Sequence, residues 1–230
     1  MQYSFVSASA AATTVPSGVD PRSGSIWVTP HDRYSSSIGV LGCKINTNRV
    51  AYWPSPVSCD KLCVKVTAND RSVTLLKVDQ SGGAYDVSYD AWNYLVTGQS
   101  ARENPAYGAG IVATWEDVDM SQCSDLLAGA GGKLPLTAAN SMNYVFNCGA
   151  DTWAAKNYAL YNIVDSVCTL GYDELCVLPP PSISNQPSCP NTLGAPVHLN
   201  GKSVINIDYG TGHQSSPADP VPSLSISVLP

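Results

Sequence analysis

Two aspartates on either side of a glycine-rich loop are the side chains best placed to do chemistry. Asp79 follows the apolar run 75–78, Ser81-Gly82-Gly83 comes next, and Asp86 precedes a helical pattern. A carboxyl group can act as a general acid or base, or accept hydrogen bonds from hydroxyl groups. Aspartate also commonly caps a helix or orders a loop, and that structural role is the alternative for both residues.

The cysteines point to an oxidising compartment. All eight lie between positions 43 and 189, and their even number without a histidine-rich pattern predicts disulfides. Such bonds persist outside the cytosol, so the chain is expected to be secreted. Cys59 and Cys63 have a spacing that zinc tolerates, but neither a second close pair nor a nearby histidine completes a tetrahedral site.

No metal and no cofactor are expected elsewhere either. A phosphate-binding loop at 127–134 and a calcium loop at 117–128 both fail, because other residues stand at positions essential to each motif. Twelve Lys and Arg against 18 Asp and Glu give a net charge of −6, with no basic cluster. We therefore expect no nucleic acid and no membrane as partner, since nucleic acids and anionic membrane surfaces select basic patches.

The composition favours a loop-rich, mainly β protein, with 18 Gly and 17 Pro in 230 residues. In the first half, alternating apolar residues between turn signals predict strands at 26–29, 62–67, 72–78 and 110–115. Residues 88–95 read as one short helix, with Ser88 as its cap and Trp92 on the buried side.

The second half carries different signals. The spacing of Trp153, Tyr158 and Tyr161 predicts a helix over 151–168 with these rings in the core. Asn200-Gly201 between apolar residues predicts a hairpin, and residues 224–228 alternate as a further strand.

The order of these features has a family likeness. Cys59 and Cys63 open a strand, Asp79 ends the next one, a Gly loop leads to Asp86, and the helix contains Ala91-Trp92-Asn93-Tyr94-Leu95. A last strand then leads to Cys123. This order resembles the double-psi β-barrel of cerato-platanins, expansins and their endoglucanase relatives, and it is most similar to the cerato-platanins. The likeness spans about residues 25–125, and three residues separate Cys59 from Cys63 where that family has two.

The resemblance implies a mainly β fold with a six-stranded double-psi β-barrel at 25–125. A flexible N-terminal segment, 1–24, would precede it, and a disulfide-bonded α+β extension, 126–230, would follow. Cys43 would pair with Cys59, and Cys63 with Cys123. The four later cysteines would pair among themselves: Cys148, Cys168, Cys176 and Cys189.

The resemblance also implies a groove across the barrel in which a polysaccharide lies. Six residues of this chain would line it: Asp79, Asp86, Tyr85, Thr29, Tyr34 and Trp53. At the position of Asp86 expansins and glycosidases carry Asp, whereas cerato-platanins tend to carry Asn. If the protein were an enzyme, Asp86 would be the general acid and Asp32 the second carboxylate, although Asp32 could instead pair with the adjacent Arg33.

Three functions follow as alternatives. The first, which the resemblance favours, is a secreted, non-hydrolytic protein of the extracellular space or cell wall that binds polysaccharide, as chitin oligomers or β-glucan. The second is a glycoside hydrolase-like enzyme acting on a β-linked glycan. The third is recognition of a protein partner through the extension, as an elicitor, effector or inhibitor.

Overall fold

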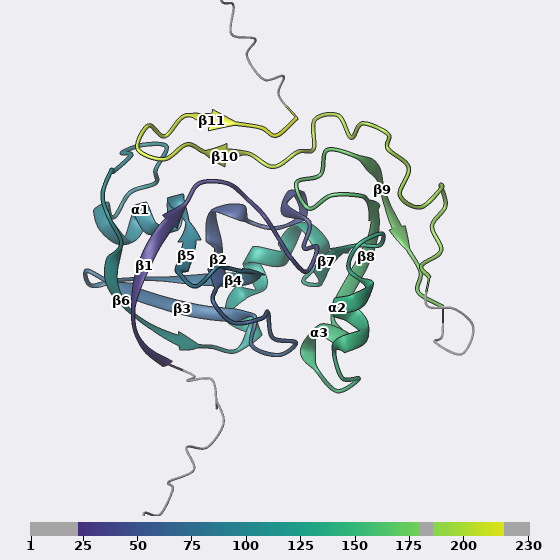
Figure 1. The fold of residues 1–230 in the computed structure, drawn as a ribbon, viewed down its shortest axis with the longest axis horizontal. Helices are drawn as coiled ribbons and strands as arrows, with labels where there is room; N and C mark the ends of the chain where they lie inside the picture. Colours follow the sequence, from purple (N-terminus) through teal and green to yellow (C-terminus); the bar gives the residue numbers. More distant parts are fainter. Residues whose placement is uncertain (1–22, 180–185, 219–230) are drawn as a thin grey trace, which may run out of the picture.

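Six strands of the first half close into a barrel in the computed structural model, which describes residues 23–179 and 186–218 (Figure 1). Neighbouring strands follow the order β1-β5-β2-β4-β3-β6 before the barrel closes. Their bounds are β1 Ser23–His31, β2 Val50–Trp53, β3 Cys63–Ala68, β4 Arg71–Gln80, β5 Tyr85–Ser88 and β6 Ile111–Asp117. The predicted mainly β fold with a six-stranded barrel is confirmed.

Two strands are inserted between strands that are consecutive in sequence. β4 lies between β2 and β3, and β5 lies between β1 and β2. In each case the inserted strand is parallel to one neighbour and antiparallel to the other, with β2–β4 and β1–β5 as the parallel pairs. These two insertions are the psi motifs after which a double-psi barrel is named.

The barrel interior is filled by the alternating apolar residues of its strands, as the sequence predicts. Val64 and Val66 of β3 are fully buried, and they share one core cluster with Val28, Ala51 and other inward residues. The helix α1 (Tyr89–Thr97) adds its buried side to the same cluster, including Trp92. Gly98 ends this helix in the left-handed region at φ 81°, which glycine adopts without strain.

Asp90 holds the start of α1 in place. Its carboxylate accepts hydrogen bonds from Ser100 Oγ at 2.6 Å and the Ala101 amide at 2.8 Å, and pairs with Arg49 at 2.7 Å. Burial alone would raise the pKa of Asp90, but these hydrogen bonds and the Arg49 charge outweigh it and lower that pKa. Ser88 precedes the helix, yet its side chain makes no capping hydrogen bond.

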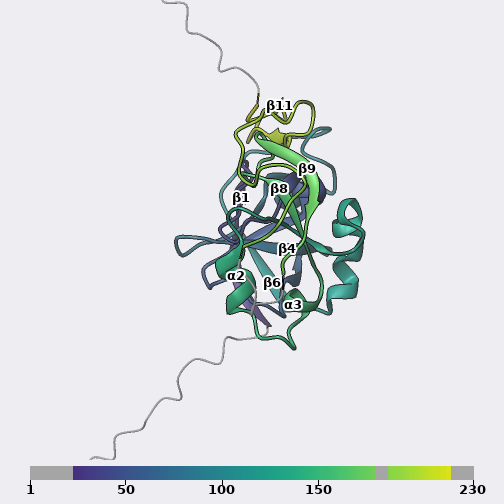
Figure 2. The same ribbon diagram turned by 90° about the vertical axis from the view of Figure 1, so that its right-hand side faces the viewer.

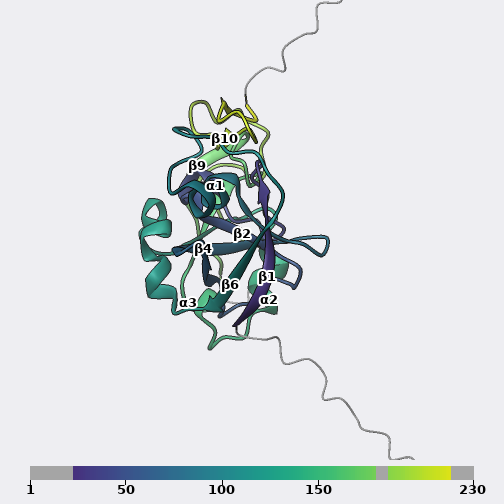
Figure 3. The same ribbon diagram turned by 90° about the vertical axis from the view of Figure 1, so that its left-hand side faces the viewer.

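The extension adds a second, three-stranded sheet in the order β7-β8-β9. Figure 2 views it from the side where these strands and two short helices lie in front of the barrel, and Figure 3 shows the barrel from the opposite side. The 3-10 helix η3, Met120–Ala130, leads from the barrel into the extension. The elements of the extension are β7 Leu134–Thr137, α2 Met142–Asn147, α3 Trp153–Lys156, β8 Tyr158–Ile163, β9 Gly171–Cys176, β10 Asn206–Ile207 and β11 Gln214–Ser215. Two short 3-10 helices, η1 Gly42–Lys44 and η2 Thr47–Arg49, precede β2.

The extension shares a core with the outer face of the barrel. Tyr52 and Leu76 on the barrel belong to one cluster with Leu134, Leu136 and Leu160 of the new sheet. The final segment then crosses over toward α1, where β10 and β11 lie in Figure 1. Burial of this apolar surface, rather than a linker, therefore determines how the two parts meet.

Two predicted disulfide assignments are wrong, and the shared core explains why. The bonds are Cys43–Cys168, Cys59–Cys148, Cys63–Cys123 and Cys176–Cys189. Cys43 does not pair with Cys59, and the four later cysteines do not pair only among themselves. Packing of the extension on the barrel brings Cys148 and Cys168 next to the loops that carry the two early cysteines.

Two element predictions in the second half are also wrong. Within the predicted helix 151–168, only Trp153–Lys156 is helical. The next residues form β8, which is parallel to β7 and antiparallel to β9. The Asn200-Gly201 turn exists, but the paired strands are β10 and β11, which lie further along the chain. The predicted strand at 224–228 and nearly all of the N-terminal segment lie outside the described residues. No helix among those described is both long and apolar enough to cross a membrane.

Candidate functional site

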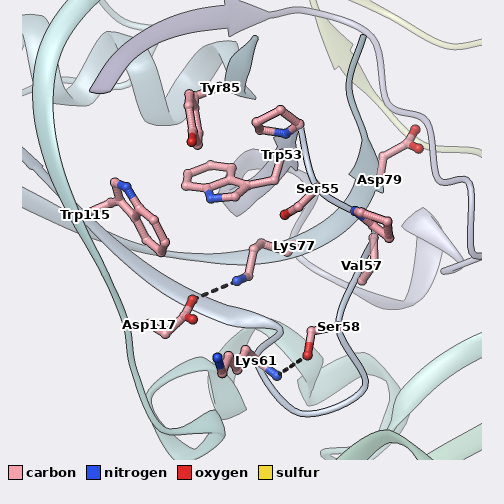
Figure 4. Close-up of a pocket in the computed structure, with 12 residues that line it drawn as sticks. Trp53, Ser55, Val57, Ser58, Lys61, Lys77, Asp79, Tyr85, Trp115 and Asp117 are labelled. Atoms are coloured by element: carbon pink, nitrogen blue, oxygen red, sulfur yellow. Dashed lines mark hydrogen bonds and ion pairs between the residues drawn. The ribbon is translucent and has the colours of Figure 1, made fainter. Parts of the chain in front are cut away.

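A pocket of about 120 Å³ opens at the end of the barrel where β2, β4, β5 and β6 carry aromatic and charged residues (Figure 4). The loop that follows β2 forms its rim. The lining residues are Trp53, Pro54, Ser55, Pro56, Val57, Ser58, Lys61, Lys77, Asp79, Tyr85, Trp115 and Asp117. Its lining mixes aromatic rings with polar and charged groups, and a hollow where a few polar groups converge beside aromatic rings is a common form of small-ligand site.

Three aromatic rings make the apolar wall. Trp53 meets Tyr85 edge to face with ring centroids 5.2 Å apart, and it meets Trp115 in the same way at 5.9 Å. Trp53 is 3 % exposed, and its Nε1 has no hydrogen-bond partner among the residues that the structure describes. Figure 4 shows this nitrogen on the edge of the indole that faces Lys77. A buried N–H without a partner is costly, so a ligand or solvent acceptor at this point would be stabilising.

An ion pair forms the polar side of the pocket. Lys77 Nζ donates to Asp117 Oδ1 at 2.7 Å, and the ammonium lies 6.0 Å from the ring centroid of Trp115. Lys77 is only 7 % exposed. Because β3 separates β4 from β6, this pair reaches across one strand at the barrel end. The two charges neutralise each other, so the pocket offers hydrogen-bonding atoms without a strong net field.

Asp79, which the resemblance assigns to the groove, lines the pocket but serves a neighbouring loop. Its carboxylate accepts hydrogen bonds from Ser35 Oγ at 2.6 Å, the Ser37 amide at 2.9 Å and the Gln80 amide at 2.8 Å. In Figure 4 it turns away from the ion pair of Lys77 and Asp117. Asp79 is therefore largely occupied as an anchor for the loop after β1.

Asp86 does not line this pocket. It accepts a hydrogen bond from Thr29, its register partner on β1. The register places Thr29, Asp86, Tyr52 and Asp79 in one row across β1, β5, β2 and β4. Burial, followed by the charges of Asp79 and Asp86, raises the pKa of Tyr52, which therefore keeps its proton. The two aspartates are thus separated by a buried neutral tyrosine.

Tyr34 and Asp32 lie beneath the last part of the extension. Tyr34 is buried, its hydroxyl donates to the Val40 carbonyl at 2.8 Å, and its amide donates to Asn206 Oδ1. Asp32 accepts a hydrogen bond from the amide of Tyr209 at 3.4 Å. Neither residue lines the barrel-end pocket.

The ion pair considered for Asp32 is made by another acid. Arg33 pairs with Asp208 at 3.0 Å, and Asp208 also faces His213 at 3.1 Å. Burial favours a higher pKa for Asp208, but the bonds from His213 and Ser215 and the Arg33 charge lower it. These contacts hold the β10–β11 hairpin against the loop after β1.

The pocket thus unites Trp53, Tyr85 and Asp79 of the predicted groove set and leaves out Thr29, Tyr34 and Asp86. The other nine lining residues were not predicted, among them the three that carry most of the pocket's chemistry: Lys77, Trp115 and Asp117. A signal for them was present, because Lys77 interrupts the apolar run 75–78, and Trp115 and Asp117 are two positions apart on one strand.

Comparison with known proteins gives a limited result. No family model matches the chain, and no curated protein matches it. The solved structures that are similar include cerato-platanin 3 from M. perniciosa at 17 % identity and cerato-platanin 2 from the same organism at 16 %. Each match covers 44 % of this chain and 98 % of the other, with a TM-score of 0.32. At that score the fold assignment depends on the strand order and pairing alone.

Proposed function

We propose that the protein binds a segment of a neutral polysaccharide at the barrel-end pocket and does not hydrolyse it. One observation carries the proposal: three aromatic rings, a neutralised Lys–Asp pair and an unpartnered indole N–H converge on one hollow. Aromatic rings can pack against the apolar C–H face of a sugar, and the polar atoms can satisfy its hydroxyl groups. The four disulfides fit an extracellular protein, and we place its action in the extracellular space or cell wall.

The volume restricts what enters. At about 120 Å³ the pocket is smaller than the roughly 300–1,000 Å³ of a typical small-molecule site. That space suits a substituent or one edge of a sugar ring, while the rest of the polymer would lie along the 54–58 loop. An acetamido group fits best: its oxygen would accept from Trp53 Nε1 once a small turn of the indole uncovers this buried N–H, while its methyl packs on Tyr85. We therefore favour chitin oligomers over β-glucan.

The carboxyl groups of the pocket support binding without hydrolysis. A glycosidase needs two available carboxyl groups across the scissile bond, one of them a general acid with a raised pKa. Asp117 is paired with Lys77, and Asp79 already accepts three hydrogen bonds.

Calorimetric titration with a chitin tetramer and with a cellulose tetramer tests this proposal. Trp53→Phe keeps a ring in the wall but removes the N–H, and loss of one hydrogen bond of about 1 kcal/mol should weaken chitin binding about fivefold. Trp27→Phe is the matched control, because Trp27 is 65 % exposed and lies outside the pocket. Equal affinity of wild type and Trp53→Phe, or no binding of either sugar, would refute the assignment. Release of new reducing ends would make the protein an enzyme.

A second candidate function is recognition of a protein through the extension. Leu175 on β9 and Val177 just after it are 59 % and 70 % exposed, and β9 is the edge strand of its sheet. The backbone of Val177 is already paired with Ser188, so a partner would dock on the exposed apolar side chains and not add a strand. Leu175→Ser/Val177→Ser should abolish binding to a purified receptor without changing the affinity for sugar. If the receptor bound wild type and the double variant equally, this candidate function would be wrong.

A further inference from the structure

A second hollow of about 530 Å³ lies apart from the barrel-end pocket and shares no residue with it. It is a groove between the η1–η2 segment, Arg102 and the chain at 201–205. Its charged lining residues are Lys44, Lys202, Arg102 and Asp173. Three cations and one anion leave the groove with a net charge of +2, in a chain whose net charge is −6.

Asp173 fixes two of the cations. It accepts from Lys44 Nζ at 2.7 Å and from Lys202 Nζ. The Lys44 ammonium also lies 4.9 Å from the centroid of the Tyr161 ring, a cation–π distance. Although burial favours a higher pKa for Asp173, the hydrogen bonds and charges of the two lysines lower it, so the carboxylate stays ionised. The lysines are thus held at one point of the groove instead of moving freely in solvent.

This excess of positive charge is local. Among the described ion pairs, Asp173 is the only acid that holds two lysines; the others meet one lysine or arginine each. Arg102 is exposed, and its guanidinium makes no hydrogen bond or ion pair with any residue that the structure describes. A guanidinium presents a planar fork of donors that matches a carboxylate or sulfate group.

We infer that this groove binds an anionic glycan, with one acidic group of the sugar on Arg102 and another near the Lys44–Lys202 pair. The groove supplies the complementary charge, and its amide and hydroxyl side chains, Asn46, Asn48 and Ser203, can bond sugar hydroxyls. Carboxylates of uronic acids and sulfate esters share the required chemistry. The site is independent of the barrel-end pocket, and a glycan with both neutral and acidic residues could occupy both.

The test compares an oligogalacturonate with its methyl ester, in which the same sugar chain carries neutral ester groups in place of carboxylates. The free acid should bind at low ionic strength, and its affinity should fall as salt shortens the screening length from about 30 Å to about 8 Å. The ester should not bind at either salt concentration. Arg102→Gln/Lys202→Gln should weaken binding of the acid at least tenfold. Arg102→Gln alone should weaken it in the same direction; Arg102 has no side-chain partner among the described residues, so this variant folds unchanged.

Lys65→Gln/Lys133→Gln is the matched control, because it also removes two positive charges from the protein, but at positions outside the groove. This control should keep the wild-type affinity for the oligogalacturonate. An equal loss of affinity in both double variants would mean that overall charge attracts the ligand, and it would overturn the site. Equal affinity for the acid and the ester would overturn it too. So would a failure to bind both the acid and a sulfated oligosaccharide. Tighter binding of the sulfated ligand would identify sulfate as the preferred group. Trp53→Phe should leave this affinity unchanged, which separates failure of the groove from failure of the pocket.

Discussion

Serine in place of both Cys43 and Cys168 tests whether the extension contributes to the stability of the barrel. Cys43 lies in η1, just before the strands of the barrel resume, and Cys168 lies between β8 and β9. Their Cα atoms are 6.1 Å apart, and Cys168 shares a buried cluster with Leu41 and Ile163. The bond therefore joins the extension to the barrel at a packed point.

The expected loss follows from the loop that the bond closes. Cys43 and Cys168 are 125 residues apart, but the Cys59–Cys148 bond shortens the path. With the Cys59–Cys148 bond intact, the Cys43–Cys168 bond closes a covalent loop made of residues 43–59 and 148–168, about 36 residues. The entropy of closing such a loop corresponds to about 3.8 kcal/mol. The Cys176–Cys189 bond closes a separation of 13 residues and corresponds to about 2.9 kcal/mol. The first double variant should thus be the less stable by about 1 kcal/mol.

Urea unfolding followed by tryptophan fluorescence gives the answer, because Trp53, Trp92 and Trp115 all report on the barrel. Cys43→Ser/Cys168→Ser should lower the midpoint of a single transition, and Cys176→Ser/Cys189→Ser is the comparison. An unchanged fluorescence midpoint, or a second transition at lower urea, would mean that the extension unfolds by itself. The shared core would then not couple the two parts.

Three other changes have expected outcomes in the same unfolding assay. Lys77→Met should lower the free energy of unfolding by about 3–5 kcal/mol, because it leaves Asp117 buried without its partner. Lys77→Met/Asp117→Leu should recover most of that loss, and an equal loss in both variants would contradict this explanation. Asp90 has a lowered pKa, so its stabilisation is present above the ordinary value of 3.8 and is lost as the pH falls through the lower folded value. Asp90→Asn should therefore have a lower free energy of unfolding than wild type at neutral pH, and this difference should shrink as the pH falls. A difference that does not change with pH would refute the role of the Asp90 charge. Gly42→Ala should cost about 1–3 kcal/mol, because its Cβ would overlap the Val204 side chain, and a neutral result would show that this contact yields easily.

The barrel strands could be predicted because their signals are local. Alternation in 62–67 and 72–78 predicted β3 and β4, and the helical spacing around Trp92 predicted α1. Strand alternation and helical spacing are decided within a few residues, so one sequence is enough to read them. Trp53 and Tyr85 were expected in a groove because of the resemblance, and both line the pocket.

The extension could not be predicted, because its structure depends on distant partners. Tyr158 and Tyr161 are three positions apart, a spacing that fits a helix, but the segment gains its hydrogen bonds from β7 and β9. Thr152 caps a helix of one turn, and Asn157 ends it by donating its side-chain amide to the Trp153 carbonyl. Sheet pairing across the chain overrides a weak local preference of this kind.

The same long-range packing explains why the predicted groove and the candidate pocket differ. Residues opposite each other in register share one face of a sheet, so Asp86 lies beside Tyr52 on the outer side of the barrel. Asp79 is the other register partner of Tyr52 and lies where this face meets the pocket. The extension buries Tyr52 in the shared core, and the segment after Val204 covers Asp32. A polymer lying across this face would have to displace that packing. The extension does not cover the barrel-end pocket in this way, and its rim, where Tyr85 is partly exposed, is therefore where we place the sugar.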